Sequence, residues 1–232
     1  MSGQQDIPER LFDDWPARYD AWFETQIGAL VKKYESALLM DLLRPEVGEL
    51  ILDVGCGTGV FTCDILARGA RVIGLDISSP MLQQAAKKAK GYSFQAVAGD
   101  MISLPFGREC FDRVFSMTAL EFIEDGQAAV RELLRVAKKG GTVVVTTLNS
   151  LSPWAVRRKQ KAQQGHRLFQ SMIFRSPDEL RALGGTTAEV RTAIHFQKDE
   201  HPLRASEVEM EGQKKNLNTG AFLAARWVKP SN

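Results

Sequence analysis

Cysteine and histidine are scarce in this chain of 232 residues, which contains three of each. The cysteines, Cys56, Cys63 and Cys110, are odd in number and lack metal-ligand spacing, which argues against a disulfide framework and a zinc site. The chain also has no signal peptide and no apolar run long enough to cross a membrane. We therefore expect a cytoplasmic protein with reduced thiols, no bound metal and no membrane span.

A large excess of charge of one sign is absent as well. The formal net charge is +2, which is too small to demand a polyanionic partner. Aromatic residues that stack on bases are sparse among the basic residues, so we expect no nucleic-acid partner. The composition, 44% hydrophobic and 25% charged, is that of an ordinary globular protein, and no linker-like stretch divides the chain. We expect a single domain, residues 1–232.

The stretch 50–62 is the most informative part of the chain. An apolar run ends at Asp53, three glycines follow at alternate positions, and apolar periodicity then resumes. This pattern predicts a buried strand that turns sharply into a helix over a bound ligand. The dinucleotide fingerprint G-x-G-x-x-G would need a third glycine where this chain has Val60, and Asp53 would repel a pyrophosphate. An acid there instead suits a ligand with an ammonium or sulfonium group.

Further strand-like runs end in residues that suit a nucleoside. The second run ends in Asp76, whose carboxylate could accept both ribose hydroxyls. The third brings Asp100 for an adenine amino group and Met101 for packing on the ring. Two more strands are expected, over 111–117 and 142–148. Ligands of open α/β sheets bind at the carboxyl ends of the strands, so these features predict one shared site.

The chain resembles class I S-adenosylmethionine-dependent methyltransferases in the acid at 76 and in four runs: D-V-G-C-G-T-G at 53–59, G-D-x-x-x-L-P-F at 99–106, F-D-R-V-F at 111–115 and K-G-G at 139–141. The likeness covers residues 45–150 and is to the small-molecule branch that includes ubiquinone and menaquinone biosynthesis methyltransferases. It implies an α/β fold: a Rossmann-like three-layer sandwich with a seven-stranded, mostly parallel sheet whose last strand is antiparallel. Residues 1–44 would form an N-terminal helical cap, 45–150 the cofactor-binding core, and 151–232 a substrate-side insertion and the last strands.

The resemblance also implies the cofactor, S-adenosylmethionine, and its product, S-adenosylhomocysteine. Asp53 is expected to order the glycine loop, with hydrogen bonds around the methionyl ammonium as one way of doing so. The expected cofactor-binding residues are Tyr19, Asp53, Gly55, Cys56, Gly57, Thr58, Gly59, Asp76, Ile77, Gly99, Asp100, Met101, Ser116 and Met117.

The segment 15–44 is expected to form one long helix before Pro45. Its aromatic start, Tyr19, Trp22 and Phe23, would form part of a lid, because a sulfonium is attracted to aromatic faces. The alternative is that these side chains are only the hydrophobic underside of a helix.

Tyr19, Glu121 and His166 are the candidates for a catalytic role. The resembled family often carries histidines after the fourth strand, whereas this chain has none between 100 and 165. A buried Glu121 could act as a base or a substrate anchor, because desolvation raises a carboxyl pKa. The alternatives are a capping or surface acid for Glu121, with Asp125 as the better N-cap, and a plain surface residue for His166.

Past residue 150 the likeness weakens. A basic segment, 157–167, could hold an anionic acceptor such as a carboxylate or phosphate, or form a solvated helix face. We expect a sixth strand over 188–196, a polar connection over 197–219 and a seventh strand over 220–228.

These observations predict methyl transfer from S-adenosylmethionine to a small-molecule acceptor by in-line displacement. Such a transfer needs mainly the placement of donor and acceptor and the exclusion of water. A non-catalytic S-adenosylmethionine-binding or regulatory protein and a nucleotide-dependent oxidoreductase are the alternatives. The acceptor, the methylated atom and the oligomeric state stay open.

Overall fold

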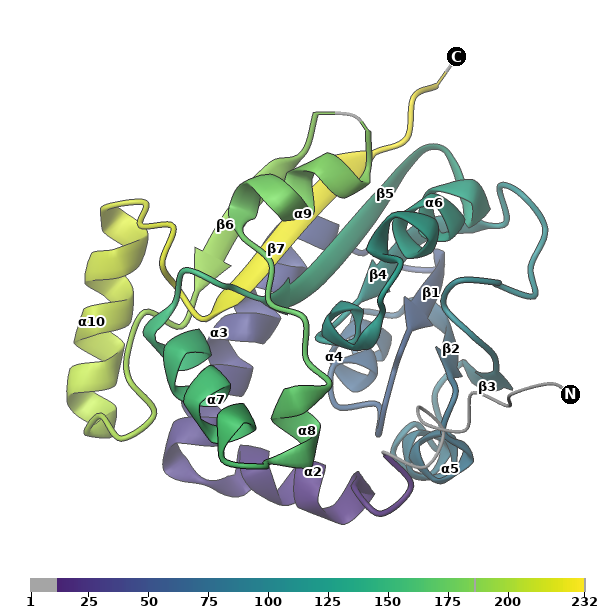
Figure 1. Ribbon diagram of the computed structural model, residues 1–232. Coiled ribbons are helices and arrows are strands. Elements are labelled where there is room, and N and C mark those ends of the chain that lie inside the picture. Colours follow the sequence, from purple (N-terminus) through teal and green to yellow (C-terminus); the bar gives the residue numbers. More distant parts are fainter. Residues whose placement is uncertain (1–11, 186, 232) are drawn as a thin grey trace, which may run out of the picture.

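The computed structural model describes residues 12–185 and 187–231, whose strands form one seven-stranded sheet in the order β3-β2-β1-β4-β5-β7-β6 (Figure 1). Strand β7 is antiparallel to both of its neighbours, and the other pairs are parallel. The expected mostly parallel sheet with an antiparallel last strand is confirmed. The strands are β1 (Leu50–Val54), β2 (Arg71–Asp76), β3 (Phe94–Ala98), β4 (Phe111–Ser116), β5 (Ala137–Leu148), β6 (Glu189–Ala193) and β7 (Phe222–Val228).

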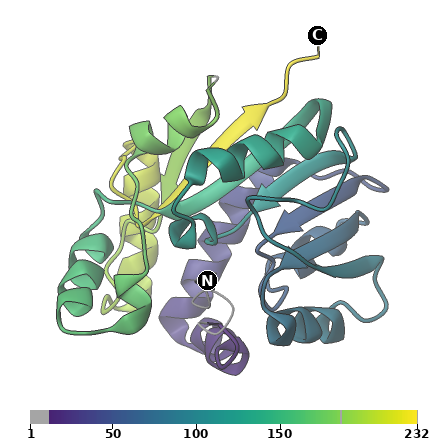
Figure 2. The same ribbon diagram turned by 45° about the vertical axis from the view of Figure 1, so that its right-hand side comes forward.

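Helices cover both faces of the sheet, and α2, α7 and α8 lie beyond the carboxyl ends of its parallel strands (Figures 1 and 2). None of the helices in the described ranges is both long and apolar enough to cross a membrane. The helices are α2 (Pro16–Glu24), α3 (Gln26–Leu43), α4 (Thr62–Leu66), α5 (Ser79–Lys88), the 3-10 turn η1 (Leu120–Phe122), α6 (Gly126–Val136), α7 (Pro153–Gln163), α8 (Arg167–Gln170), α9 (Pro177–Leu183) and α10 (Pro202–Lys214).

The three layers follow from the alternation of apolar side chains along the central strands. On β5, Val144 packs into the core formed with α3 and α4, whereas Val143 and Val145 pack into the core formed with α6 and α9. Successive side chains of a strand point to opposite faces, so a continuous apolar strand needs cover on both sides. The sheet is therefore the middle layer between two helical layers.

The segment 15–44 is helical as expected, but it consists of two helices that meet at Thr25 instead of one continuous helix. Thr25 is extended, with ψ 153°, and its hydroxyl accepts a hydrogen bond from the Gly28 amide at 3.0 Å, which caps α3. Helix α3 packs against β5 and β7, whereas α2 leaves it to contact α5. Apolar periodicity does not reveal such a break, since both helices keep apolar side chains on their inner faces.

The polar connection expected over 197–219 is also wrong, since it contains the 13-residue helix α10. Only Ala205, Glu209 and Gly212 of this helix are buried, where it packs against α3 and β6. A helix whose buried positions are a small residue, an acid and a glycine has almost no hydrophobic periodicity for a sequence reading to detect.

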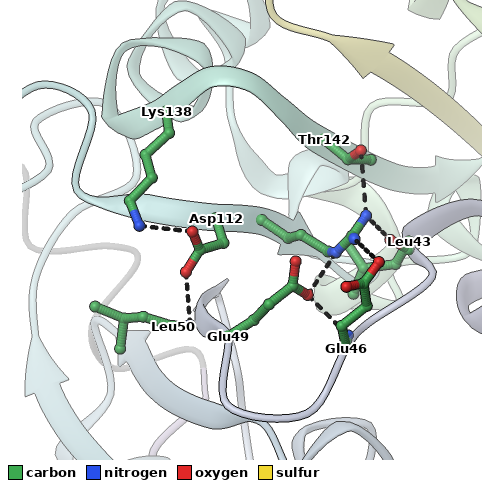
Figure 3. A network of polar contacts seen from close by, with 8 residues as sticks. Leu43, Glu46, Glu49, Leu50, Asp112, Lys138 and Thr142 are labelled. Carbon is green, nitrogen blue, oxygen red and sulfur yellow. Dashed lines mark hydrogen bonds and ion pairs between the residues drawn. The ribbon is translucent and has the colours of Figure 1, made fainter.

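A polar network fixes the amino ends of the central strands, away from the strand tips (Figure 3). Arg113 of β4 donates to the Glu49 carboxylate at 2.6 Å and to the carbonyl of Leu43, the last residue of α3, at 2.8 Å. Asp112 accepts from the Leu50 amide at 2.9 Å at the start of β1. These bonds hold α3, β1 and β4 in register with one another.

Candidate active site

The candidate site lies where the strand order reverses. Strand β1 pairs with β2 on one side and with β4 on the other. The sheet therefore grows from β1 in one direction through β2 and β3, and in the other direction through β4 and β5. Open α/β sheets bind ligands at such a switch point. A cavity of about 1120 Å³ lies there, which exceeds the roughly 300–1,000 Å³ of common small-molecule sites. It has room for a cofactor and a second small molecule.

The loop after β1 needs its glycines for two reasons. Gly55, Gly57 and Gly59 have φ angles of 74°, 52° and 77°, which other residues rarely adopt. A Cβ at Gly55 would also lie 2.4 Å from the Cβ of Ala119, which follows β4. The loop can therefore approach both the exit of β4 and a ligand closely.

Asp53, near the end of β1, is a buried acid with one oxygen left over. Its Oδ2 accepts from the Thr62 hydroxyl at 2.5 Å, whereas Oδ1 is buried without a partner in the described part of the chain. Burial raises the pKa of Asp53 to about 7; the Thr62 hydrogen bond opposes the rise and the Asp76 charge adds to it. A ligand ammonium in the cavity would satisfy Oδ1.

Asp76, at the end of β2, holds the glycine loop in place. Its Oδ2 accepts from the Gly57 amide at 2.8 Å, and its Oδ1 accepts from the Ser78 amide at 2.9 Å. Burial raises the pKa of Asp76, and these backbone hydrogen bonds oppose the rise. A carboxylate has about four acceptor sites, so it keeps capacity for ribose hydroxyls. Sequence reasoning predicted the ribose contact of Asp76 but missed its hydrogen bond to the loop, because that bond depends on where the loop folds back toward β2.

Most of the expected cofactor-binding residues line the cavity: Tyr19, Asp53, Gly55, Cys56, Gly57, Asp76, Ile77, Gly99, Asp100, Met101 and Met117. Three others do not line it. The Thr58 hydroxyl donates to Asp20 at 2.6 Å, Gly59 packs against Ala85 of α5, and Ser116 is buried within β4. These three support the loop and the strand from behind.

Helix α2 crosses the open end of the site between α5 and α7 (Figure 2). Asp20 ties it to the cofactor side, because its carboxylate accepts from Lys88 of α5 at 2.5 Å as well as from Thr58. The rings of Tyr19 and Phe23 meet edge to face at 5.1 Å, and both line the cavity together with Trp22. The aromatic side chains of α2 therefore face the ligand space as well as packing against their neighbours.

Glu121 is buried at 2% exposure in η1 and lines the cavity, so it is not a surface acid. It accepts from the Thr147 hydroxyl at 3.3 Å, and burial raises its pKa to about 7. Asp125 is the N-cap of α6, as expected, since it accepts from the Ala128 amide at 2.8 Å.

The other two catalytic candidates also reach the cavity. Burial raises the pKa of Tyr19 further above its usual value, and the nearby Glu35 carboxylate adds to the rise. His166 is exposed at the cavity edge, where its ring stacks on Phe169 with 4.0 Å between centroids.

Two further charged residues line the same cavity: Glu35, which sequence reasoning missed, and Arg158, which belongs to the basic segment expected to hold an anionic acceptor. Glu35 of α3 is 7% exposed, and burial raises its pKa to about 8. Arg158 of α7 has a buried Nη1 without a partner in the ranges described. Glu35 did carry a signal, because it is an acid on the apolar stripe of Val31 and Leu38. Nothing in the basic segment distinguished Arg158 from its neighbours.

Comparison with known proteins identifies the class. Residues 52–145 match the methyltransferase domain family. A demethylmenaquinone methyltransferase of Thermobifida fusca is 33% identical over 188 residues, which is 73% of this chain and 79% of that protein. A malonyl-[acyl-carrier protein] O-methyltransferase of Erwinia pyrifoliae is 39% identical over 110 residues, 47% of this chain and 41% of that one. The chain belongs to the class I S-adenosylmethionine-dependent methyltransferases that act on small molecules.

A solved structure has the same fold. It is an S-adenosylmethionine-dependent methyltransferase of Thermotoga maritima, described as a possible histamine N-methyltransferase. The TM-score is 0.73 at 22% identity, over 95% of this chain and 99% of that chain. The matched family and the relatives confirm the expected methyltransferase in preference to an oxidoreductase or a non-catalytic binding protein.

Proposed function

We propose that the enzyme holds S-adenosylmethionine at the tips of β1, β2 and β3 and its acceptor beneath α2, between α3 and α7. The observation that carries this proposal is one continuous cavity that joins the glycine loop to the buried Glu121. Residues 1–44, of which 1–11 lie outside the described residues, then act as the cap, 45–150 as the cofactor-binding core and 151–232 as the substrate side, within one cytoplasmic domain.

The cofactor's parts are assigned by the chemistry of the lining residues. Asp76 accepts hydrogen bonds from the ribose, Asp100 accepts one from the adenine amino group, and Met101 packs on the ring. The backbone at Gly55 and the free Oδ1 of Asp53 hold the methionine end. The orphaned Oδ1 supports this fit, because a buried acceptor without a donor is costly until a ligand supplies one.

S-adenosylmethionine supplies an electrophilic methyl group, so the protein's task is placement and the exclusion of water. The aromatic side chains of α2 close the site over the sulfonium, to which they are attracted. Glu121 takes the proton that the acceptor loses, since a carboxyl pKa of about 7 lets it gain and release a proton near neutral pH. Tyr19 orients the acceptor, and His166 contacts it at the cavity edge.

The acceptor is proposed to carry an anionic group. The relatives' names point to different acceptors, a menaquinone precursor and a malonyl thioester, so family membership leaves the acceptor to the local side chains. On the α7 side these are Arg157, Arg158, Lys161 and the facing Lys198.

Calorimetry and thermal shift with S-adenosylmethionine, S-adenosylhomocysteine and NAD test the cofactor half of the proposal. We expect the first two to bind and to raise Tm, and NAD to do neither. Incubation with methyl-labelled S-adenosylmethionine and a small-metabolite extract then tests transfer. A protein that binds neither sulfur compound would refute the assignment.

A further inference from the structure

Two buried carboxyls, Glu35 and Glu121, and the half-buried Arg158 face the cavity without close partners of opposite sign. Glu35 accepts no hydrogen bond from the described part of the chain, Glu121 accepts a long one from Thr147, and Arg158 Nη1 is buried without a partner there. Ion pairs within the same ranges join Arg157 to Asp199 and His195 to Glu209, but none joins Arg158 to either cavity glutamate. The protein thus brings acidic and basic side chains to one cavity without pairing them.

A buried ion without a partner is costly, by several kcal/mol, so burial raises the pKa values of Glu35 and Glu121 and both carboxyls stay partly protonated near neutral pH until a positive group pairs with them. The opposite charges are close enough to act on one another, because Arg158 lowers the pKa of both Glu35 and Glu121 against the larger effect of burial. They come from different elements, α3, η1 and α7, that surround one cavity. A ligand with a positive and a negative group would pair with the two glutamates through the first group and with Arg158 through the second.

The acidic group of this set adjoins the cofactor. Tyr19 lines the same cavity as Glu35, Glu121 and Asp53. Burial raises the pKa of Tyr19, the three carboxylates add to the rise, and a hydrogen bond with Thr118 opposes it. Asp53 belongs to β1, directly before the glycine loop. The positive part of a bound acceptor would therefore lie beside the cofactor's methionine end.

The basic group lies on the opposite wall. Burial lowers the pKa of Lys198, and repulsion from Lys161, Arg158 and Arg157 lowers it further. Like charges gathered at a cavity wall favour an anion there. Helix α7, which carries three of these residues, is separated from α5 and the β2 tip by α2 (Figures 1 and 2).

Building on the proposed function, we propose that the methyl acceptor is a small amine that carries an acid group, a carboxylate or a phosphate-like group. Its amino nitrogen binds at Glu35 and Glu121, and its acid group binds at Arg158 and Lys198. The methylated atom is the amino nitrogen.

The chemistry of an amine uses both glutamates. Glu35 accepts a hydrogen bond from the ammonium, and Glu121 takes one proton from it, which exposes the nitrogen lone pair. The new nitrogen–carbon bond then forms as the carbon–sulfur bond of the donor breaks, and that electron pair stays on sulfur. The positive charge passes from sulfur to the methylated nitrogen. A hydroxyl acceptor would need one base and would leave Glu35 unpaired.

Matched probe sets test the inference. Each set contains an amphoteric compound, the same skeleton without the amine, and the same skeleton without the acid. The sets are 4-aminobutyrate, butyrate and butylamine; phenylalanine, 3-phenylpropanoate and 2-phenylethylamine; and 3-aminopropylphosphonate, propylphosphonate and propylamine. Binding is measured by calorimetry on the enzyme saturated with S-adenosylhomocysteine, and transfer is measured from methyl-labelled S-adenosylmethionine. The carboxylate and phosphonate sets distinguish the two kinds of acid group.

In at least one set we expect the amphoteric compound to bind tenfold or more tightly than either partner and to be methylated on nitrogen. Glu35→Gln should raise its KM about tenfold with little change in kcat, and Arg158→Gln should erase the preference for the acid group. Glu24→Gln at the exposed end of α2 and Lys159→Gln on the outer side of α7 are the matched controls and should change neither.

Failure of this inference and failure of the proposed function give different results. If S-adenosylhomocysteine binds but no amphoteric probe exceeds its partners, the amino-acid-like acceptor is refuted and the cofactor assignment stands. If S-adenosylhomocysteine does not bind, the proposed function itself fails. The comparison among probes uses the unaltered enzyme, so it holds even if a variant does not fold.

Discussion

The two walls of the cavity differ in how their charged groups are satisfied. On the cofactor wall, both oxygens of Asp76 accept backbone hydrogen bonds, and Asp53 lacks a donor for only one oxygen. On the acceptor wall, Glu35 and Glu121 are buried and Arg158 is half-buried over the Trp154 ring, and no ion pair joins Arg158 to either carboxyl within the described residues. The first wall is shaped before any ligand arrives, whereas the second depends on its ligand for its pairing.

This difference corresponds to how the two walls are built. The cofactor wall consists of strand tips and the loops directly after them, where the sheet fixes the backbone. The acceptor wall consists of side chains from separate helical elements, α2, α3, η1 and α7, whose identities can change without altering the sheet. One fold can therefore keep its cofactor while its acceptor varies.

The largest expected effect is on the acceptor wall. Glu121→Gln should lower kcat by roughly 10²–10⁴-fold, because a positioned general base contributes about that much. In the unaltered enzyme, kcat should rise with pH through about 7, as the Glu121 carboxyl loses its proton and becomes able to accept one. Stopped or continuous assays across this pH range measure both effects. Unchanged S-adenosylmethionine affinity in calorimetry is the control, and a flat pH profile in the unaltered enzyme would contradict the assignment.

The ion pair of His195 with Glu209 contrasts with Arg158 and the cavity glutamates, which form no ion pair with one another. His195 and Glu209 are 3% and 0% exposed, and their side chains lie 3.1 Å apart. Glu209→Ala should reduce the free energy of unfolding by about 3 kcal/mol, the low end for breaking a buried pair because histidine can shed its proton. Urea unfolding measures this, with Glu211→Ala on the exposed side of α10 as control. A loss of cofactor affinity in Glu209→Ala would contradict the assignment of this pair to stability alone.

The same pair has a defined pH dependence. Burial alone lowers the pKa of His195, but the Glu209 carboxylate raises it above its ordinary 6.5. The contribution of His195 to the free energy of unfolding is therefore complete below pH 6.5 and is lost as the pH rises through the raised pKa. Burial raises the pKa of Glu209, but its bonds with His195 lower it below 4.5, so that contribution is lost at acid pH. The Tm difference between the unaltered protein and Glu209→Ala should be largest between about pH 4.5 and 6.5.

On the cofactor wall, Asp76→Ala should weaken S-adenosylmethionine binding by about 1.5–3 kcal/mol, the size of hydrogen bonds to a charged group. The loss combines the ribose contacts with the release of the Gly57 amide. Calorimetry measures it, and Asp112→Ala is the control, because that acid bonds at the far end of the sheet (Figure 3). Equal losses in the two variants would mean that only general stability had changed.

The smallest expected effect is at the boundary between the walls. Asp20→Asn weakens the tie of α2 to Lys88 and Thr58, and we expect the cofactor affinity to fall by about 0.5–1 kcal/mol, the upper range for a partly exposed ion pair. The fall should shrink in high salt, since salt screens such pairs. Calorimetry at two salt concentrations tests this, with Glu24→Gln as control. An effect as large as that of Asp76→Ala would make α2 part of the cofactor wall itself.

Sequence reasoning succeeded where local pattern and chemistry coincide. Glycine spacing and the terminal acids of the apolar runs located the strand tips, and the cavity meets Asp53, Asp76 and Asp100 as a result. It failed where a contact distant in sequence decides the structure. The polar helix α10 is fixed by packing against α3 and β6, which no local periodicity records. The break at Thr25 has a local cause, the cap on the Gly28 amide, but apolar periodicity does not reveal it.

The sequence by itself determined the class of protein, the cofactor and the sheet, because each depends on residues that are neighbours in the chain. Only the tertiary structure brought Glu35, Glu121 and Arg158 to one cavity, from segments more than 30 residues apart. Charge placed by folding leaves no local signature: an acid on a helix and an arginine in a basic run look alike whether they face water or a substrate.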